Sequence, residues 1–150
     1  MIQQFFDVFK ALLPDGVECL LGAEHLNEND SPPRIVVVPN TGQFDAGGGE
    51  PGINPLTGLR ATPRGTRTLN VDIVIWGADL PTTDAVADEV YVLLCQNFRF
   101  DGPIREEWDT DRYVMQEGFT ISLTVPLTSL LWEGAEFTQL QSFRCSSCQS

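Results

Sequence analysis

The sequence predicts an α+β domain in which a small, mainly antiparallel sheet carries two helices packed on one face. Two observations predict this class: apolar residues recur at helical spacing in two segments, and they alternate with polar residues in others. The length of 150 residues suits one domain, and a hydrophobic content of 42% is enough for a core. We expect the domain to span residues 1–130 and a C-terminal tail to span 131–150, where periodicity is weak.

The two helices are expected near the N-terminus and in the middle of the chain. Apolar residues repeat at helical spacing from Ile2 to Leu13, and Pro14 with Gly16 ends that run. The second helix is expected to begin at Thr82 or Thr83, either of which can cap it. Its apolar stripe consists of Val86, Val90, Leu93 and Leu94.

Four segments have the pattern of strands. A short apolar run covers residues 17–21, and residues 35–38 are apolar on both faces, which is typical of an inner strand. Residues 69–76 and 119–127 alternate, the latter most clearly. In this segment, polar Thr and Ser alternate with five apolar residues that fall on one face of the strand, so helices are expected to cover only that face of the sheet. The five apolar residues are Phe119, Ile121, Leu123, Val125 and Leu127.

Residues 40–68 lack periodicity and contain seven glycines and three prolines. We expect a long loop insertion, which we call the arm. Ordering it costs on the order of 1–2 kcal/mol per residue, so its partners are expected to be other chains. Arginine binds carboxylates bidentately, and the expected contacts between subunits are therefore Arg60, Arg64 and Arg67, together with Phe44.

The charge balance excludes some functions. The formal net charge is −12, which argues against binding nucleic acid through phosphate neutralisation, because that requires Lys and Arg. It is compatible with DNA passing an acidic wall without sticking. No apolar run approaches the roughly 18 residues that span a bilayer, and the first residues lack the basic start of a signal peptide. We therefore expect no membrane partner.

Residues that could carry chemistry are few. His25 is the only histidine and is expected on a solvated loop, and Gly47-Gly48-Gly49 lacks the Gly-Lys-Ser/Thr of a phosphate loop. A polar connection is expected at 99–111, where solvated carboxylates surround Trp108: Asp101, Glu106, Glu107, Asp109 and Asp111. We expect no enzyme, no catalytic residue, no metal site and no cofactor.

The four cysteines fall into two pairs. Cys19 and Cys95 lie in apolar runs and are expected to be buried thiols. Cys145 and Cys148 lie among polar residues near the chain end. A disulfide between chains, a local bridge between the two, and a reduced tail all remain open for this second pair.

Four segments, taken in order, resemble the successive segments of tail-terminator or tail-completion proteins of tailed bacteriophages. These are SPPRIVVVP at 31–39, VDIVIWGAD at 71–79, DAVADEVYVLL at 84–94 and EGFTISLTVPL at 117–127. The Pro-Pro-Arg entry into an apolar strand, the Trp-Gly-Ala-Asp strand end and the final Val-Pro are the most specific parts. The resemblance covers roughly residues 1–130 and contains no catalytic motif.

The resemblance implies a lambda-type terminator fold and a virion protein assembled in the host cytoplasm. Such proteins form a ring, usually a hexamer, that caps the tail tube, ends its growth and joins the tail to the neck. The implied partners are other copies of the chain, the tube protein and a neck or head-completion protein, with DNA passing through the channel. Two alternatives are another neck or tail ring component, and a small hydrolase or ligand-binding domain using the acidic residues near Trp108.

Overall fold

The structure is a computed structural model that describes residues 1–26, 33–47, 50, 52–54, 58–109 and 118–133. Two helices and one 3₁₀ helix accompany six strands in these residues. In chain order the elements are α1 (Ile2–Leu12), β1 (Glu18–Leu21), η1 (Ala23–His25), β2 (Arg34–Asp45), β3 (Gly52–Ile53), β4 (Arg60–Gly77), α2 (Leu80–Asn97), β5 (Arg105–Asp109) and β6 (Phe119–Glu133).

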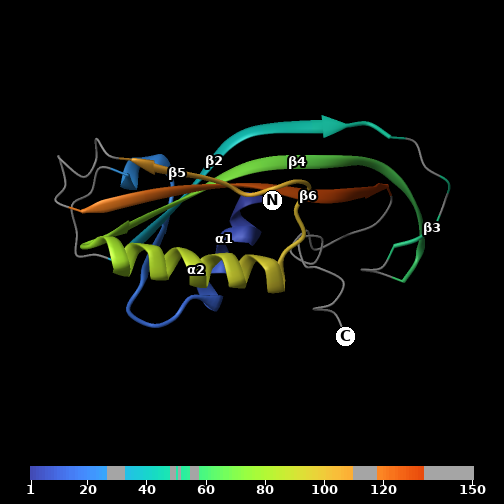
Figure 1. Cartoon of the computed structure of the whole chain (residues 1–150). Helices are drawn as coiled ribbons and strands as arrows, with labels where there is room; N and C mark the ends of the chain where they lie inside the picture. Colours follow the sequence, from blue (N-terminus) through green and yellow to red (C-terminus); the bar gives the residue numbers. More distant parts are fainter. Residues whose placement is uncertain (27–32, 48–49, 51, 55–57, 110–117, 134–150) are drawn as a thin grey trace.

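The sheet has the strand order β1-β2-β4-β6-β5, and β3 pairs with β4. Only β1 and β2 run parallel; the other described pairs are antiparallel. Both α-helices lie on the same face of the sheet (Figure 1). The predicted fold class is confirmed: α+β, with a sheet that is mixed but mainly antiparallel and helices on one side.

The core fills the space between the helices and the sheet. Phe5 and Phe9 of α1 stack with their ring centroids 5.6 Å apart, and Phe98 tilts against Phe5 at 4.9 Å. Alternate residues of the central strands face these rings, as the alternating pattern predicts. On the sheet side the core consists of Ile35, Val37, Leu69, Val71, Ile73, Ile75, Ile121, Leu123, Val125 and Leu127.

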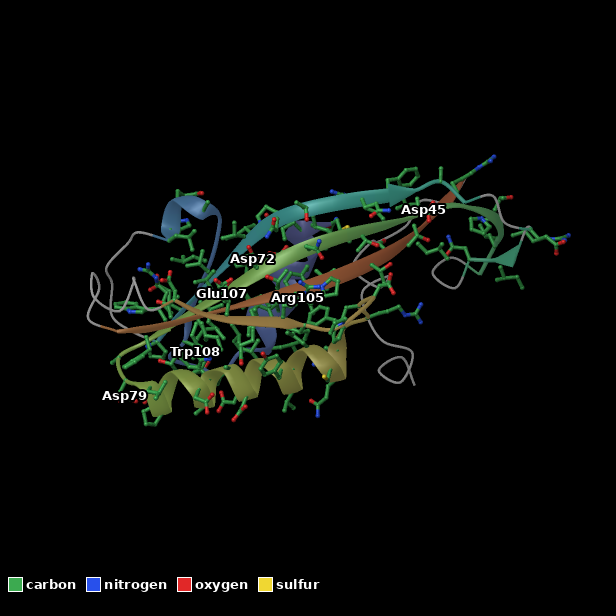
Figure 2. The ribbon with its side chains drawn as sticks, turned by 45° about the horizontal axis from the view of Figure 1, so that its top comes forward. Asp45, Asp72, Asp79, Arg105, Glu107 and Trp108 are labelled. Carbon is green, nitrogen blue, oxygen red and sulfur yellow. The ribbon has the colours of Figure 1, made fainter. Side chains whose placement is uncertain are left out.

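The start of α2 differs from the prediction. Asp79, rather than Thr82 or Thr83, is the N-cap, and its carboxylate accepts a hydrogen bond of 2.8 Å from the Thr82 N–H (Figure 2). Hydrogen bonds from Thr82 lower the pKa of Asp79, because they favour the ionised carboxylate. Thr83 donates its hydroxyl to the Asp79 carbonyl at 2.8 Å, so it lies inside the first turn.

The arm is not the structureless loop that its composition predicts. Residues 40–45 continue β2 and residues 60–68 belong to β4, so much of the arm is strand. The β2–β4 ladder reaches Asp45 opposite Thr66, and β6 runs along the other side of β4 to Glu133 opposite Thr62. Shared backbone hydrogen bonds order these strands where a core is lacking, and Figure 1 shows them extending past the helices.

The polar connection at 99–111 also contains a strand that the sequence did not predict. β5 pairs antiparallel with β6 at the edge of the sheet, with Trp108 opposite Ile121. Trp108 packs against the core on the helix side (Figure 2). The neighbouring residues Glu107 and Asp109 therefore point to the other face.

Candidate functional site: the arm and the open face of the sheet

The four predicted contact residues are all exposed on the arm. Arg60, Arg64 and Arg67 belong to β4 and Phe44 to β2, and Phe44 is 54% exposed. Phe44 is paired in register with Arg67, so an aromatic ring and a guanidinium occupy adjacent positions on the ladder. The structure brings these residues onto one projecting element, and their contact with other subunits stays a prediction.

A bend lies directly under Phe44. Gly65 has φ of 152°, and the β4–β6 register shifts between Pro63 and Gly65. A Cβ added at Gly65 would come within 2.6 Å of a carbon of the Phe44 ring. Glycine is therefore needed both for the backbone conformation and for the close approach of the ring.

The arm ends in a compact tip that the sequence analysis missed. Ile53 is 68% exposed and Leu59 is 66% exposed. The Asn54 N–H donates to the Leu59 carbonyl at 2.9 Å, and the Gly58 N–H donates to the Asn54 carbonyl at 2.8 Å. These bonds join the described backbone on the two sides of residues 55–57, and Ile53 pairs in register with Arg60.

The arm differs in charge from the rest of the chain. Residues 40–68 contain three arginines against two carboxylates, which gives a net charge of +1; the chain total of −12 therefore leaves −13 for all other residues. A surface with apolar and cationic groups on an otherwise acidic molecule is suited to binding acidic surfaces.

The sheet face opposite the helices, which carries Val36, Asp72, Trp76 and Thr124, is called the open face here. At one end of it Arg34 is only 3% exposed. Its guanidinium carbon lies 5.6 Å from the centroid of the Trp76 ring, and its Nη2 donates to the His25 carbonyl at 2.8 Å. Burial of this cation is thus compensated by a ring face and a carbonyl oxygen.

His25 is not on the solvated loop that the sequence predicts. It is the last residue of η1, and it is half-buried. Its Nε2 lies 3.8 Å from Glu24 Oε1, which makes an ion pair only when the ring is protonated. Its backbone carbonyl accepts the hydrogen bond from Arg34 and so ties η1 to β2.

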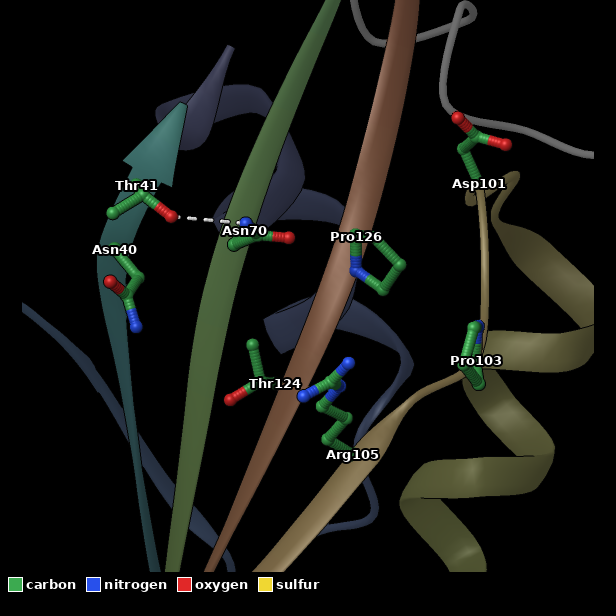
Figure 3. Close-up of a pocket in the computed structure, with 8 residues that line it drawn as sticks. All are labelled: Asn40, Thr41, Asn70, Asp101, Pro103, Arg105, Thr124 and Pro126. Atoms are coloured by element: carbon green, nitrogen blue, oxygen red, sulfur yellow. Dashed lines mark hydrogen bonds between the residues drawn. The ribbon is translucent and has the colours of Figure 1, made fainter. Parts of the chain in front are cut away.

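A polar groove of about 350 Å³ lies farther along the open face (Figure 3). Asn70 Nδ2 donates to Thr41 Oγ1 at 3.1 Å across two strands. The groove is lined by Asn40, Thr41, Asn70, Asp101, Pro103, Arg105, Thr124 and Pro126.

Asp72 lies beside this groove and is held by its neighbours. Its Oδ1 accepts a bond of 2.7 Å from Thr124, and its Oδ2 accepts one of 3.0 Å from Asn40. The described residues contain no group of three or more side chains that could hold a metal ion. The polar groups of the groove are amides, hydroxyls, one carboxylate and one guanidinium, which are suited to hydrogen bonding with another polar surface.

The predicted acidic loop is instead an acidic edge strand with two different faces. Glu106 lies on the helix side, where it accepts a hydrogen bond of 3.0 Å from the Tyr91 hydroxyl of α2. Burial, that bond and the charges of Glu106 and Asp88 raise the pKa of Tyr91 to about 12. Asp111 lies outside the described residues.

The cysteine predictions are half correct. Cys19 is buried as expected, and desolvation raises the pKa of its thiol to about 12. Cys95 is exposed on α2, so the prediction of a buried thiol there was wrong. The apolar run around it contains residues of more than one helix face. Cys145 and Cys148 lie outside the described residues.

Together, the fold and these surfaces define a small α+β protein with a projecting, partly cationic β arm. The sequence matches no known family model and no curated protein. Among the described helices none is both long and apolar enough to cross a membrane.

Proposed function

We propose that this chain is a structural protein of a tailed-phage particle. In this proposal it forms a ring, six-fold in symmetry, that caps the tail tube, ends tube growth and joins the tail to the neck. The observation that carries the proposal is the arm, an ordered three-strand extension whose exposed side chains have no core of their own. The order of the resembling segments supports the same assignment.

The surface of the arm favours a protein partner. Phe44, Ile53 and Leu59 are each more than half exposed, and an apolar surface on a projecting element is typical of an interaction site. β1 pairs with β2, and β5 with β6, only in the body of the domain. In the arm, β2 and β6 are therefore the edge strands among the described residues, and unpaired edges are a common place for another chain to bind.

The charge distribution fits a ring through which DNA moves. Outside the arm the chain carries a net charge of −13. Acidic residues on a channel wall repel phosphate, so duplex DNA passes without binding. The arm, with its opposite charge, is then free to bind neighbouring protein surfaces.

Electron microscopy of assembled particles tests the proposal directly. We expect a six-fold ring of this chain between the tail tube and the neck, with a central channel wide enough for duplex DNA. A closed monomer or a stable dimer in the particle contradicts it. A ring at another level of the neck or tail would instead favour the alternative of a head-completion or tube protein.

A deletion and a matched pair of charge variants test the role of the arm. Deleting residues 44–62 should leave a folded chain that no longer attaches to tubes. Replacing Arg60, Arg64 and Arg67 by Gln should also weaken attachment. The matched single changes are Arg64→Gln in the arm, which should weaken attachment, and Arg99→Gln outside it, which should not. Equal attachment by these two single variants, counted as capped tubes in micrographs, would contradict a role for the arm.

A further inference from the structure

A second groove, of about 470 Å³, lies on the helical side of the molecule between the end of α1 and the middle of α2. Its apolar surface is unusually accessible, since Leu12 is 37% exposed and Val92 is 53% exposed. The lining consists of Leu12, Pro14, Asp88, Glu89, Val92 and Leu93. We call it the α1–α2 groove.

The lining of the α1–α2 groove combines four apolar residues with two carboxylates, both from α2. Asp88 and Glu89 are both exposed on α2. Lys10, the cation of α1, does not line the groove; its ammonium lies 5.7 Å from the centroid of the Phe6 ring. A partner that matches this groove therefore has apolar side chains accompanied by a cation.

The tip of the arm has this combination. Ile53 and Leu59 provide two large exposed apolar side chains, and Arg60 follows directly in β4. The Arg60 side chain is exposed, and its guanidinium makes no hydrogen bond or ion pair with the residues that the structure describes. Figures 1 and 2 show the tip at the end of the molecule away from α2, so the matching surfaces of one copy do not face each other.

We infer that the arm tip of one copy docks in the α1–α2 groove of the next copy. Ile53 and Leu59 contact the apolar residues of the groove, and Arg60 binds the carboxylates of Asp88 and Glu89. Because the two surfaces differ, the contact is heterologous, and repetition of such a contact gives a closed ring when the rotation between copies closes. The inference deepens the proposed ring by naming the contact between its subunits.

Cross-linking tests this contact with a thiol that the chain already has. Cys95 is exposed on α2, three residues after Val92, and residues three apart are neighbours on one helix face. In a chain carrying Cys145→Ser and Cys148→Ser, adding Leu59→Cys should let a short bismaleimide join separate copies. The control is Glu107→Cys on the exposed edge strand, which should give no more cross-links than the background chain.

A charge exchange tests the same contact without cross-linking. Arg60→Glu should weaken self-association roughly tenfold, as expected for losing a charged pair in a small interface. Asp88→Arg with Glu89→Arg should do the same, and combining all three substitutions should restore much of the association. Arg99→Glu makes the same charge change at an exposed position that lines neither groove, and it should leave association unchanged. Sedimentation velocity over a concentration series measures each effect, with circular dichroism checking the fold.

The outcomes separate this inference from the ring itself. Cross-links that require Leu59→Cys and Cys95, together with recovery by the charge exchange, support docking of the tip in the groove. Absence of cross-links between copies at every concentration, or association unchanged by Arg60→Glu, overturns it. If particles contain the ring and the Arg60→Glu chain assembles into it as well as the parent does, the proposed function stands and the contact between subunits lies elsewhere.

Discussion

The body of the domain and the arm share three strands, β2, β4 and β6, yet they differ in burial and in charge. In the body, Val71, Ile73 and Ile75 of β4 are fully buried beneath the helices. In the N-terminal part of the same strand, Arg60, Arg64 and Arg67 are exposed. The β4–β6 ladder runs from the body into the arm with one register shift, between Pro63 and Gly65. Backbone hydrogen bonding therefore determines where a strand extends, and helix cover determines where a core exists.

The two regions therefore differ in what stabilises them. The body gains about 25 cal/mol for each Å² of apolar surface that leaves water. The arm depends mainly on backbone hydrogen bonds, each of which contributes about 1 kcal/mol net. We expect the arm to open locally well below the free energy of global unfolding, and substitutions in each region test this difference.

The largest expected effect is in the body. Leu123→Ala removes a fully buried side chain of β6 and should lower the free energy of unfolding by about 2–5 kcal/mol. Phe44→Ala removes a larger side chain from the arm. It should change the free energy of unfolding by less than about 0.5 kcal/mol, because more than half of the Phe44 side chain is exposed. Urea denaturation followed by circular dichroism measures both. Similar losses for the two variants would show that the isolated arm has a core-like role.

The second effect is confined to the arm. Gly65→Ala requires a backbone conformation that residues with a Cβ rarely adopt, and it also crowds the Phe44 ring. The local cost is about 1–3 kcal/mol. Amide exchange in residues 60–68 should accelerate, while exchange at Ile73 and Leu123 stays as in the parent chain.

Gly42→Ala is the matched control for Gly65→Ala. It lies at the other irregularity of the arm, between Pro39 and Gly42, but an added Cβ there would meet its neighbours at 3.5 Å, an ordinary contact. Equal exchange in the two variants would mean that Gly65 is not the constrained position of the bend.

These contrasts also explain what the sequence could predict. The body was predictable because burial on one face leaves a period of two in a strand, as at 119–127. The strands of the arm carry no such period, since they extend past the helices that cover the body (Figure 1), and their Gly, Pro and Thr residues resemble a loop. The tip of Ile53 and Leu59 was missed for the same reason, and its one local signal is the spacing of Asn54 and Gly58.

Inside the body, the errors lie at boundaries and edges. Asp79 precedes the predicted caps Thr82 and Thr83 by three and four residues, and the local signal for it is Pro81 in the first turn together with the preference for Asp over Thr as a cap. β5 has five residues, of which Trp108 is the aromatic one that packs against the core. Its alternation of apolar and polar residues is therefore too short to recognise in the sequence. Cys95 shows that an apolar run around a helix does not reveal which residues face the core.

The smallest effect concerns a side-chain tie at the edge of the body. Tyr91 of α2 donates its hydroxyl to Glu106 of β5, and the pKa of Tyr91 is raised from 10.0 to about 12. A raised pKa means that the folded chain holds this proton more tightly than the unfolded chain. The contribution to stability is therefore complete below pH 10 and is lost as the pH rises from about 10 to about 12.

Tyr91→Phe should remove this pH dependence and weaken the tie between α2 and β5. The bond is largely solvated, so the loss at neutral pH should be below about 1 kcal/mol. The difference in unfolding free energy between parent and variant should then shrink above pH 10, and because both chains keep Cys19, its raised pKa cancels from the comparison. Tyrosinate absorbance should show one late-titrating group in the parent that is missing from the variant. If Tyr91 instead titrates near pH 10, the hydroxyl is not held by Glu106, and the edge strand is attached to the body by Trp108 and the β6 ladder alone.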